Sequence, residues 1–206
     1  MSTLTRKSET TFAFIVSAAL EMAAAEGIGK LSLGEVAKRL GISKSGVFAR
    51  VGSLEALQEA VLDESDRRFF AEVFQPALAL PAGLPRLDAM VAGWIKRAAD
   101  ADSAVACIYT AGAFEFDDLD SPLRERLQEG VVRSRAVMRR TVLQAMELGH
   151  LRPDTDPEQL VFEISSLIVG LMHEVRFMRD PSAEQRMRGA YGRLIATYKS
   201  LSYQGN

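Results

Sequence analysis

Apolar residues return every three or four positions along most of the chain, the period of an amphipathic α-helix. One such stripe, between about Ser8 and Glu26, contains Phe12, Ile15, Val16, Ala19, Met22 and Ala23. Further helices are expected in the ranges 54–73, 85–100, 103–116, 122–148, 157–178 and 182–201. No long segment alternates apolar and polar residues with a period of two, so the pattern predicts an all-α protein of about nine helices.

Two shorter helices are predicted within residues 32–51, SLGEVAKRLGISKSGVFARV. Ser32 with Glu35 three positions later forms a capping box, the usual opening of a helix. Gly41 stands where a helix ends in a left-handed residue, and Ser43 can cap the helix that follows.

In the second short helix, Val47 and Val51 lie four positions apart and can pack inward together. This leaves Lys44, Phe48 and Arg50 on its other sides. Two short helices joined by a tight turn are typical of a helix-turn-helix motif, whose second helix enters the DNA major groove. The same local pattern is also compatible with an ordinary corner between two helices.

The flanking sequence favours the DNA-binding interpretation. The run AALEMAAAEGIGKLSLGEVAKRLGISKSGVFARVGSLEALQEAVL resembles the DNA-binding domain of the tetracycline-repressor (TetR) family of bacterial transcription regulators, over roughly residues 8–65. The resemblance implies a DNA-binding domain in residues 1–53 and a ligand-binding and dimerisation domain in residues 54–206. The helix expected at 54–73 would connect the two.

The resemblance also implies which residues face DNA: Ser32, Ser43, Lys44, Ser45, Gly46, Phe48 and Arg50. Arg50 can contact a phosphate or guanine with two hydrogen bonds. Arg6 and Lys7 either form a basic arm that reaches DNA or belong to a solvated terminus. Four positions depart from the family pattern: Phe48 replaces a frequent Tyr, Arg50 stands where His or Tyr is common, Val51 replaces an aromatic residue, and Leu54 replaces a Lys that contacts phosphate.

Charge distribution gives this interpretation modest support. Residues 1–52 contain seven Lys and Arg against four Asp and Glu, a net charge of +3, whereas the whole chain carries −2. A basic N-terminal domain (the head, residues 1–52) on an acidic remainder of the chain suggests that only the head contacts phosphate.

Few residues suggest catalysis. His173-Glu174 begins the metalloprotease pattern H-E-x-x-H, but Phe177 occupies the place of its second histidine. The single cysteine, Cys107, lies in an apolar helix and cannot form an internal disulfide. We therefore expect no enzyme activity and no cofactor.

A metal ion and a membrane location are not expected either. The acidic segment 116–122, FDDLDSP, lacks the glycine and the distal glutamate of a calcium-binding loop. No run of the sequence is long and apolar enough to cross a membrane, and the N-terminus lacks the apolar core of a signal peptide. These features predict a cytoplasmic protein.

The family resemblance implies an effector pocket of unknown specificity in the C-terminal domain. Its candidate residues are Phe70, Trp94, Tyr109, Phe114, Met138, Met172 and His173. Each of them could instead be an ordinary core residue.

The last two helices carry wide apolar stripes and could pair with the same two helices of a second chain, as the family usually does. Candidate residues for this contact are Leu160, Ile164, Leu167, Ile168, Leu171, Tyr191, Leu194, Ile195 and Tyr198. The alternative is that these stripes form only the core of one chain.

The sequence as a whole predicts a regulator that binds double-stranded DNA, a small effector and a second copy of itself. Repression of a palindromic operator is the most common activity in the family. The alternative is a helical ligand-binding or interaction protein whose head has lost its affinity for DNA.

Overall fold

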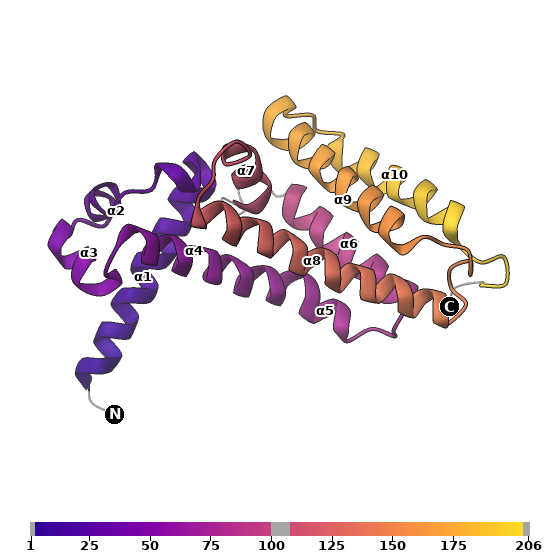
Figure 1. Cartoon of the computed structure of the whole chain (residues 1–206), viewed down its shortest axis with the longest axis horizontal. Coiled ribbons are helices and arrows are strands. Elements are labelled where there is room, and N and C mark those ends of the chain that lie inside the picture. Colours follow the sequence, from indigo (N-terminus) through magenta and orange to yellow (C-terminus); the bar gives the residue numbers. More distant parts are fainter. Residues whose placement is uncertain (1–2, 100–107, 204–206) are drawn as a thin grey trace. The chain divides into compact units, whose positions relative to one another are not determined.

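The regular secondary structure of the protein is helical in the described residues of its computed structural model, which are 3–99 and 108–203 (Figure 1). The side chains of residues 3–10 are outside this description, as is Cys107. Within the described ranges there is no β-strand, only an isolated bridge between Leu151 and Lys199. The predicted all-α fold is confirmed.

The elements follow the predicted ranges closely. They are α1 (Thr3–Glu26), η1 (Ile28–Lys30), α2 (Leu33–Leu40), α3 (Lys44–Val51), α4 (Leu54–Phe69), η2 (Phe70–Phe74), α5 (Gln75–Leu78), α6 (Leu84–Ala99), α7 (Ile108–Glu115), α8 (Pro122–Glu147), α9 (Pro157–His173), η3 (Glu174–Met178) and α10 (Ala183–Tyr198). Here η1 is a 3-10 turn, while η2 and η3 are π-helical turns that widen the ends of α4 and α9.

The chain forms two compact units, and their boundary differs from the predicted one at residue 53. Unit 1 contains Met1–Arg68 and Cys107–Gly130, while unit 2 contains Phe69–Ala106 and Val131–Asn206. Helix α4 belongs to unit 1 because Leu57 is completely buried there and the Gln58 amide donates to the Ile28 carbonyl at 3.3 Å.

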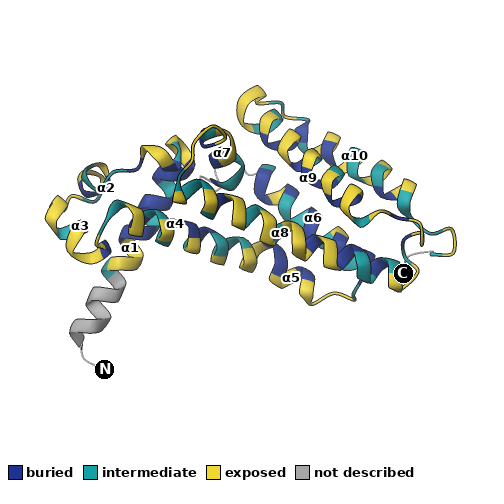
Figure 2. Ribbon diagram, viewed as in Figure 1, coloured by how far each residue is buried: buried dark blue, intermediate teal, exposed yellow. Residues whose placement is uncertain are grey.

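The core of unit 1 is built from the predicted apolar stripes. Ile15 and Leu20 of α1, Val36 of α2, Val47 of α3 and Val61 of α4 are all completely buried (Figure 2). Burying each such side chain stabilises the fold by about 1.5–3 kcal/mol relative to exposing it.

The core of unit 2 includes an aromatic cluster. The ring of Phe69 lies edge-on to Phe74 at 5.2 Å and to Trp94 at 5.1 Å. The guanidinium of Arg97 lies 5.8 Å from the Phe69 ring centre and forms an ion pair with Glu72. Trp94, a predicted pocket residue, is therefore packed against core aromatics.

Helices α9 and α10 bury part of the predicted dimer stripe within the chain. The residues Leu160, Ile164, Ile168, Leu171 and Ile195 are all buried inside the chain. Their apolar stripes pack within unit 2, so these five side chains are not available to a second chain.

The two predicted tyrosines also have partners within the chain. The Tyr191 hydroxyl donates to Asp88 at 2.7 Å, and the Tyr198 hydroxyl donates to Glu163 at 2.8 Å. Leu167 and Leu194 are half-buried. The intrachain alternative thus accounts for most of the stripe.

Candidate nucleic-acid interface

The turn between α2 and α3 is shaped by the caps that the sequence predicts. The Ser32 hydroxyl accepts the N–H of Glu35 at 3.1 Å, which starts α2. Gly41 ends α2 with φ 65°, a left-handed conformation that glycine adopts without steric cost.

Helix α3 begins in the same way. The Ser43 hydroxyl accepts the N–H of Gly46 at 3.0 Å and lies 3.2 Å from the Ser45 hydroxyl. Val47 and Val51 are buried on the inner side. These contacts fix the rotation of α3 and therefore determine which residues it presents outward.

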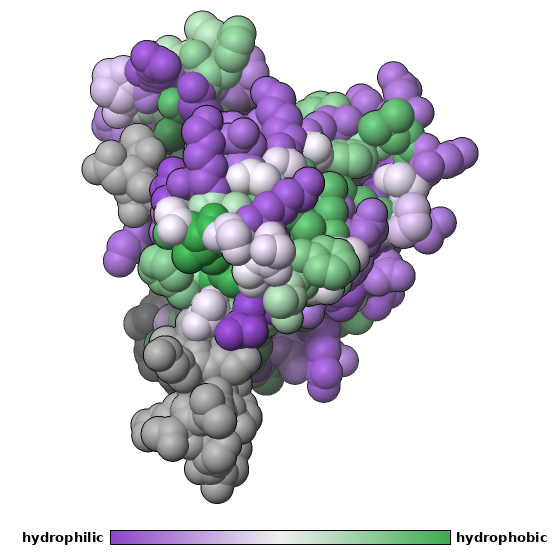
Figure 3. Space-filling model, turned by 90° about the vertical axis from the view of Figure 1, so that its left-hand side faces the viewer, coloured by the Kyte–Doolittle hydropathy of each residue, from purple (hydrophilic) through white to green (hydrophobic). Residues whose placement is uncertain are grey.

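The outer side of α3 consists of predicted DNA-facing residues. Lys44, Ser45 and Arg50 are exposed, and Phe48 is 56% exposed. Figure 3 views the molecule from the side on which α2 and α3 lie in Figure 1, and hydrophilic and apolar residues both reach that surface. Such a mixture suits phosphate contacts combined with apolar contacts to bases or sugars.

The two cations of α3 differ from those of α2. Lys38 pairs with Glu35 at 3.7 Å, and Arg39 pairs with Glu21 at 2.9 Å. Lys44 and Arg50 form no ion pair with any residue in the described part of the chain. Their charges are therefore available for an anionic partner.

Ile42, in the turn just before α3, is 42% exposed and was not among the residues predicted to face DNA. An isoleucine here can offer a methyl group to a thymine or a sugar.

The start of α4 carries no cation. Ser53 caps this helix by accepting the N–H of Ala56 at 3.1 Å, and Leu54 is half-buried. Glu55 is exposed, and a backbone hydrogen bond, followed by Ser53, lowers the pKa of its carboxyl. The first turn of α4 thus combines the apolar Leu54 with a negative charge on Glu55.

The N-terminal arm takes a different form from the one proposed. Helix α1 begins at Thr3 rather than near Ser8, which places Arg6 and Lys7 in helical backbone. Their side chains lie outside the described residues.

Residues 108–130 support the N-terminal part of unit 1 through a carboxylate. Glu115, at the end of α7, accepts the N–H of Gly29 at 3.1 Å. A Cβ on Gly29 would lie 2.6 Å from Glu115 Oε1, so only glycine allows this approach. This contact lies at the chain segment that leads into α2.

A second support is an ion-pair cluster centred on Arg126 of α8. Its guanidinium contacts Asp63 at 2.9 Å, Asp66 at 3.1 Å and Glu59 at 3.2 Å, all on α4. It also donates to the Tyr109 hydroxyl at 3.0 Å. Burial, followed by the neighbouring Asp66, raises the pKa of Tyr109, so its hydroxyl stays protonated at neutral pH.

The predicted effector residues are divided between the two units. Tyr109 and Phe114 belong to unit 1, and Phe114 is 67% exposed. Met138 and Met172 are core residues of unit 2. Three residues remain. Trp94 packs against the aromatic cluster of unit 2, whereas Phe70 on η2 and His173, which contacts Glu174 at 3.2 Å, are exposed.

Two searches of the described residues bear on other functions. No helix in residues 3–99 or 108–203 is long and apolar enough to cross a membrane. The same ranges contain no group of three or more metal-binding side chains, and Asp117 instead accepts the N–H of Asp118 at 2.9 Å.

Comparison with protein families assigns both parts of the chain. The family described as "Bacterial regulatory proteins, tetR family" matches residues 15–61. The "Tetracyclin repressor-like, C-terminal domain" matches residues 83–191. No curated protein matches the chain.

Solved structures show the same fold. A TetR regulator from Chloroflexus aurantiacus superposes with a TM-score of 0.80 at 22% identity, covering 93% of this chain and 95% of that one. AibR in complex with isovaleryl coenzyme A and operator DNA superposes with a TM-score of 0.70 at 17% identity, covering 89% of this chain and 95% of that one. A protein from Saccharomonospora viridis in complex with choline superposes with a TM-score of 0.73 at 15% identity, covering 91% of this chain and 96% of that one.

The capped turn, the outward cations of α3 and the two family matches lead to one assignment. The chain belongs to the TetR family of bacterial transcription regulators.

Proposed function

We propose that this regulator is a cytoplasmic, effector-responsive repressor that binds a palindromic operator as a homodimer. The observation that carries the proposal is the outer side of α3. There Lys44 and Arg50 are exposed, and neither forms an ion pair with another described residue.

Each α3 residue has a role suited to its chemistry. Arg50 donates two hydrogen bonds to a guanine or a phosphate, and Lys44 supplies a positive charge to the backbone. The Ser43 hydroxyl accepts from Gly46 and lies 3.2 Å from the Ser45 hydroxyl, so this pair of hydroxyls has a proton to donate to a phosphate. Phe48 offers its exposed ring to a thymine methyl group or a sugar.

The dimer contact is proposed for the outer faces of α9 and α10. Phe162 and Val169 are exposed on α9, and Gly170 follows on the same side. A Cβ on Gly170 or on Gly192 of α10 would meet nothing within 4 Å, so a second chain can approach closely there. A two-fold dimer would set its recognition helices roughly 34–36 Å apart, one turn of DNA.

Val169→Arg tests this contact. We expect the variant to sediment as a monomer, because a charge in an apolar two-fold interface is repeated on both chains. Val137→Arg is the control, since Val137 is 40% exposed on α8 and Val169 is 38% exposed. A dimer of unchanged affinity in Val169→Arg would refute the proposed face.

The effector is proposed to act by preferring one of two dimer arrangements. It can change DNA affinity only by the difference between its affinities for the two. AibR, which was solved with both an acyl-coenzyme A and its operator, is a relative for which both partners are known.

An alternative function rests on the start of α4. Leu54 and Glu55 there provide no cation for the backbone, which would suit a head that has lost DNA affinity. The exposed cations of α3 favour the regulator.

Selection from a random duplex library with the full-length protein, at two salt concentrations, tests the proposed function. We expect a palindromic motif, with affinity falling steeply as salt rises by a slope of about 0.9 per phosphate contact. Failure to enrich any sequence at low salt would favour the alternative.

A further inference from the structure

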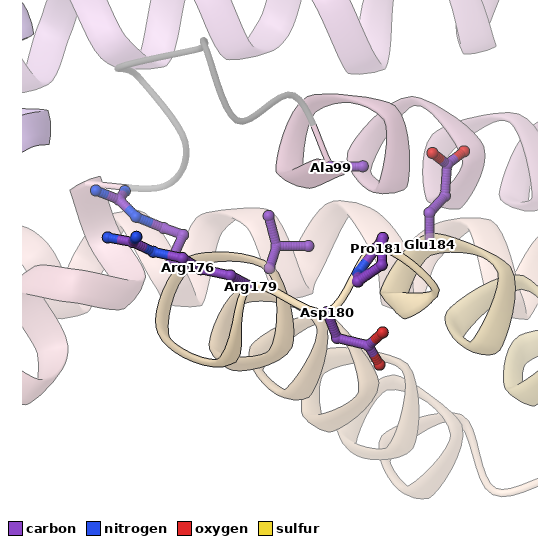
Figure 4. Close-up of a pocket in the computed structure, with 7 residues that line it drawn as sticks. Ala99, Arg176, Arg179, Asp180, Pro181 and Glu184 are labelled. Atoms are coloured by element: carbon purple, nitrogen blue, oxygen red, sulfur yellow. The ribbon is translucent and has the colours of Figure 1, made fainter.

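A pocket lies within unit 2, at the corner between α9 and α10. It has a volume of about 480 Å3, within the usual range of about 300–1,000 Å3 for small-molecule sites. Its walls come from Ala99 at the end of α6, from the turn between α9 and α10, and from Glu184 of α10 (Figure 4). None of the predicted effector residues lines it.

The backbone at this corner is unusual. Helix α9 ends in the π-helical turn η3, and Arg179 follows with φ 55° and ψ 36°. Arg179 is the one non-glycine residue with positive φ among the described residues. A branched or long side chain in this conformation costs free energy, and such positions concentrate at binding sites.

The two arginines of the corner lie together. Figure 4 shows the side chains of Arg176 and Arg179 extending to the same side of the pocket, with the carboxylates of Asp180 and Glu184 on the other side. Arginine is the preferred side chain for binding carboxylate and phosphate, because its planar guanidinium donates two parallel hydrogen bonds.

The two carboxylates of the pocket are already neutralised by cations on α10. Asp180 pairs with Arg186 at 2.7 Å, and Glu184 pairs with Arg188 at 2.8 Å. Arg179 forms no ion pair within residues 3–99 and 108–203. The guanidinium of Arg179 is therefore the positive charge that the described carboxylates of the pocket do not balance.

The rest of the lining is apolar. Val175, Pro181 and Ala99 present hydrocarbon surface beside the charged groups. A ligand that satisfies both parts has an anionic head and a short apolar chain.

We propose that this corner pocket binds a small amphiphilic anion, with a carboxylate or phosphate head on the guanidinium of Arg179 beside Arg176 and an apolar chain against Val175 and Pro181. The proposed binding of an anion does not depend on the proposed function of the protein. The use of this pocket as the effector site does rest on the proposed function.

Binding is tested with three probes that share an eight-carbon chain: octanoate, octyl phosphate and octylammonium. Isothermal titration calorimetry on the full-length protein measures affinity without any need for DNA. We expect at least one of the two anions to bind, with the comparison between them identifying the preferred head group. Octylammonium is expected not to bind.

Two variants separate the proposed site from a general charge effect. Arg179→Gln is expected to weaken anion binding by about tenfold or more, since a charge-assisted hydrogen bond is lost. Arg135→Gln removes the same charge from an exposed position on α8 and is expected to bind as the wild type does. Equal affinities of Arg179→Gln and the wild type, or no binding of either anion to the wild type, would overturn the proposal.

Arg179→Gly separates binding from folding. Glycine adopts positive φ freely, so we expect an equal or higher melting temperature together with the loss of anion binding. Unchanged anion binding in this variant would also overturn the proposal.

A final comparison addresses the effector role. The bound anion is added to a complex with the operator found by library selection. Release of DNA by the wild type but not by Arg179→Gln would establish the effector role. Unchanged DNA binding would remove the effector role and leave the binding site in place, and a protein that never binds DNA would refute only the regulator.

Discussion

Two arginines of unit 1 have opposite surroundings. Arg50, on α3, is exposed and forms no ion pair with another described residue. Arg126, on α8, has only 14% of its side chain exposed and contacts three carboxylates of α4. The same residue type is therefore available for an external anion in one place and committed to internal anions in the other.

The difference shows how this protein separates recognition from support. A guanidinium surrounded by carboxylates cannot take part in DNA binding without losing those contacts. A guanidinium without them contributes little to stability and can give its full interaction energy to DNA. Function in unit 1 can therefore be read from the partners of each cation rather than from the number of cations.

Arg50→Ala is the most direct test of the difference between the two arginines. We expect operator affinity to fall by about 30-fold or more, since each base or phosphate contact contributes about 1–3 kcal/mol and a dimer repeats it. The melting temperature should stay unchanged, because the Arg50 side chain forms no ion pair with another described residue. Fluorescence anisotropy with the selected operator provides the measurement.

Lys44→Ala should weaken binding to all sequences alike and reduce the salt slope. Arg67→Ala is the control for both variants, because Arg67 is an exposed arginine paired with Glu64 at 2.7 Å. Wild-type operator affinity in both α3 variants would refute the assignment of α3.

Arg126→Met should lower the stability of the fold, whereas the α3 variants should lower only DNA affinity. It leaves the carboxylates of Glu59, Asp63 and Asp66 near one another without their cation. We expect a loss of about 1–3 kcal/mol in the free energy of unfolding, discounted because these carboxylates are partly exposed to water. Urea denaturation provides the measurement.

Arg140→Met is the matched control, as Arg140 is exposed on the same helix. It should alter the free energy of unfolding by less than about 0.5 kcal/mol. If Arg126→Met were as stable as this control, the cluster around Arg126 would have no supporting role.

Glu64→Gln tests the supporting role of internal ion pairs by changing the carboxylate instead of the arginine. The pKa of Glu64 is lowered to about 2, mainly by its hydrogen bond to Arg67. Partial burial opposes this shift, and a hydrogen bond from Arg68 adds to it. A lowered folded-state pKa adds stability above the unfolded-state value of about 4.3, and this stability is lost as the pH falls towards 2. We expect the variant to lose about 1 kcal/mol at pH 7.

The pH dependence is the distinguishing result for this carboxylate. Urea denaturation at pH 7, 4.5 and 2.5 should show the wild type and Glu64→Gln converging in stability as the pH falls. Glu147→Gln, at an exposed position of α8, should follow the wild type at all three values. A constant difference between Glu64→Gln and the wild type would contradict the ionic explanation.

Leu54→Lys gives the smallest expected effect and adds a cation where α4 begins. One new phosphate contact in each half of the operator should steepen the dependence of log affinity on log salt by about 0.9 per contact. Leu54→Gln controls for the lost apolar side chain. An unchanged slope in Leu54→Lys would place this position away from the DNA backbone.

The recognition helix was predictable from sequence because its structure is fixed by local contacts. The N–H of Glu35 donates to the Ser32 hydroxyl and the N–H of Gly46 donates to the Ser43 hydroxyl, so each hydrogen bond spans only three residues. The inward valines, Val47 and Val51, follow from helical periodicity alone. A pattern of this kind determines both the fold of the motif and its outer face.

The corner between α9 and α10 was not predictable in the same way. Its pocket depends on a π-helical turn, on a left-handed arginine and on the end of α6, which lies far away along the chain. No local spacing signals these features. The predicted effector residues were selected for size and aromaticity, and size alone does not bring side chains together.

The sequence by itself determined the helical fold, the caps of α2 and α3, and the cations that α3 presents. Only the tertiary structure decided that Leu160 and Ile164 are core residues and that Arg126 is held by carboxylates of α4. The physical reason is the range of the interactions. Periodicity shows that one side of a helix is apolar, but the fold decides what covers it and which distant charges meet.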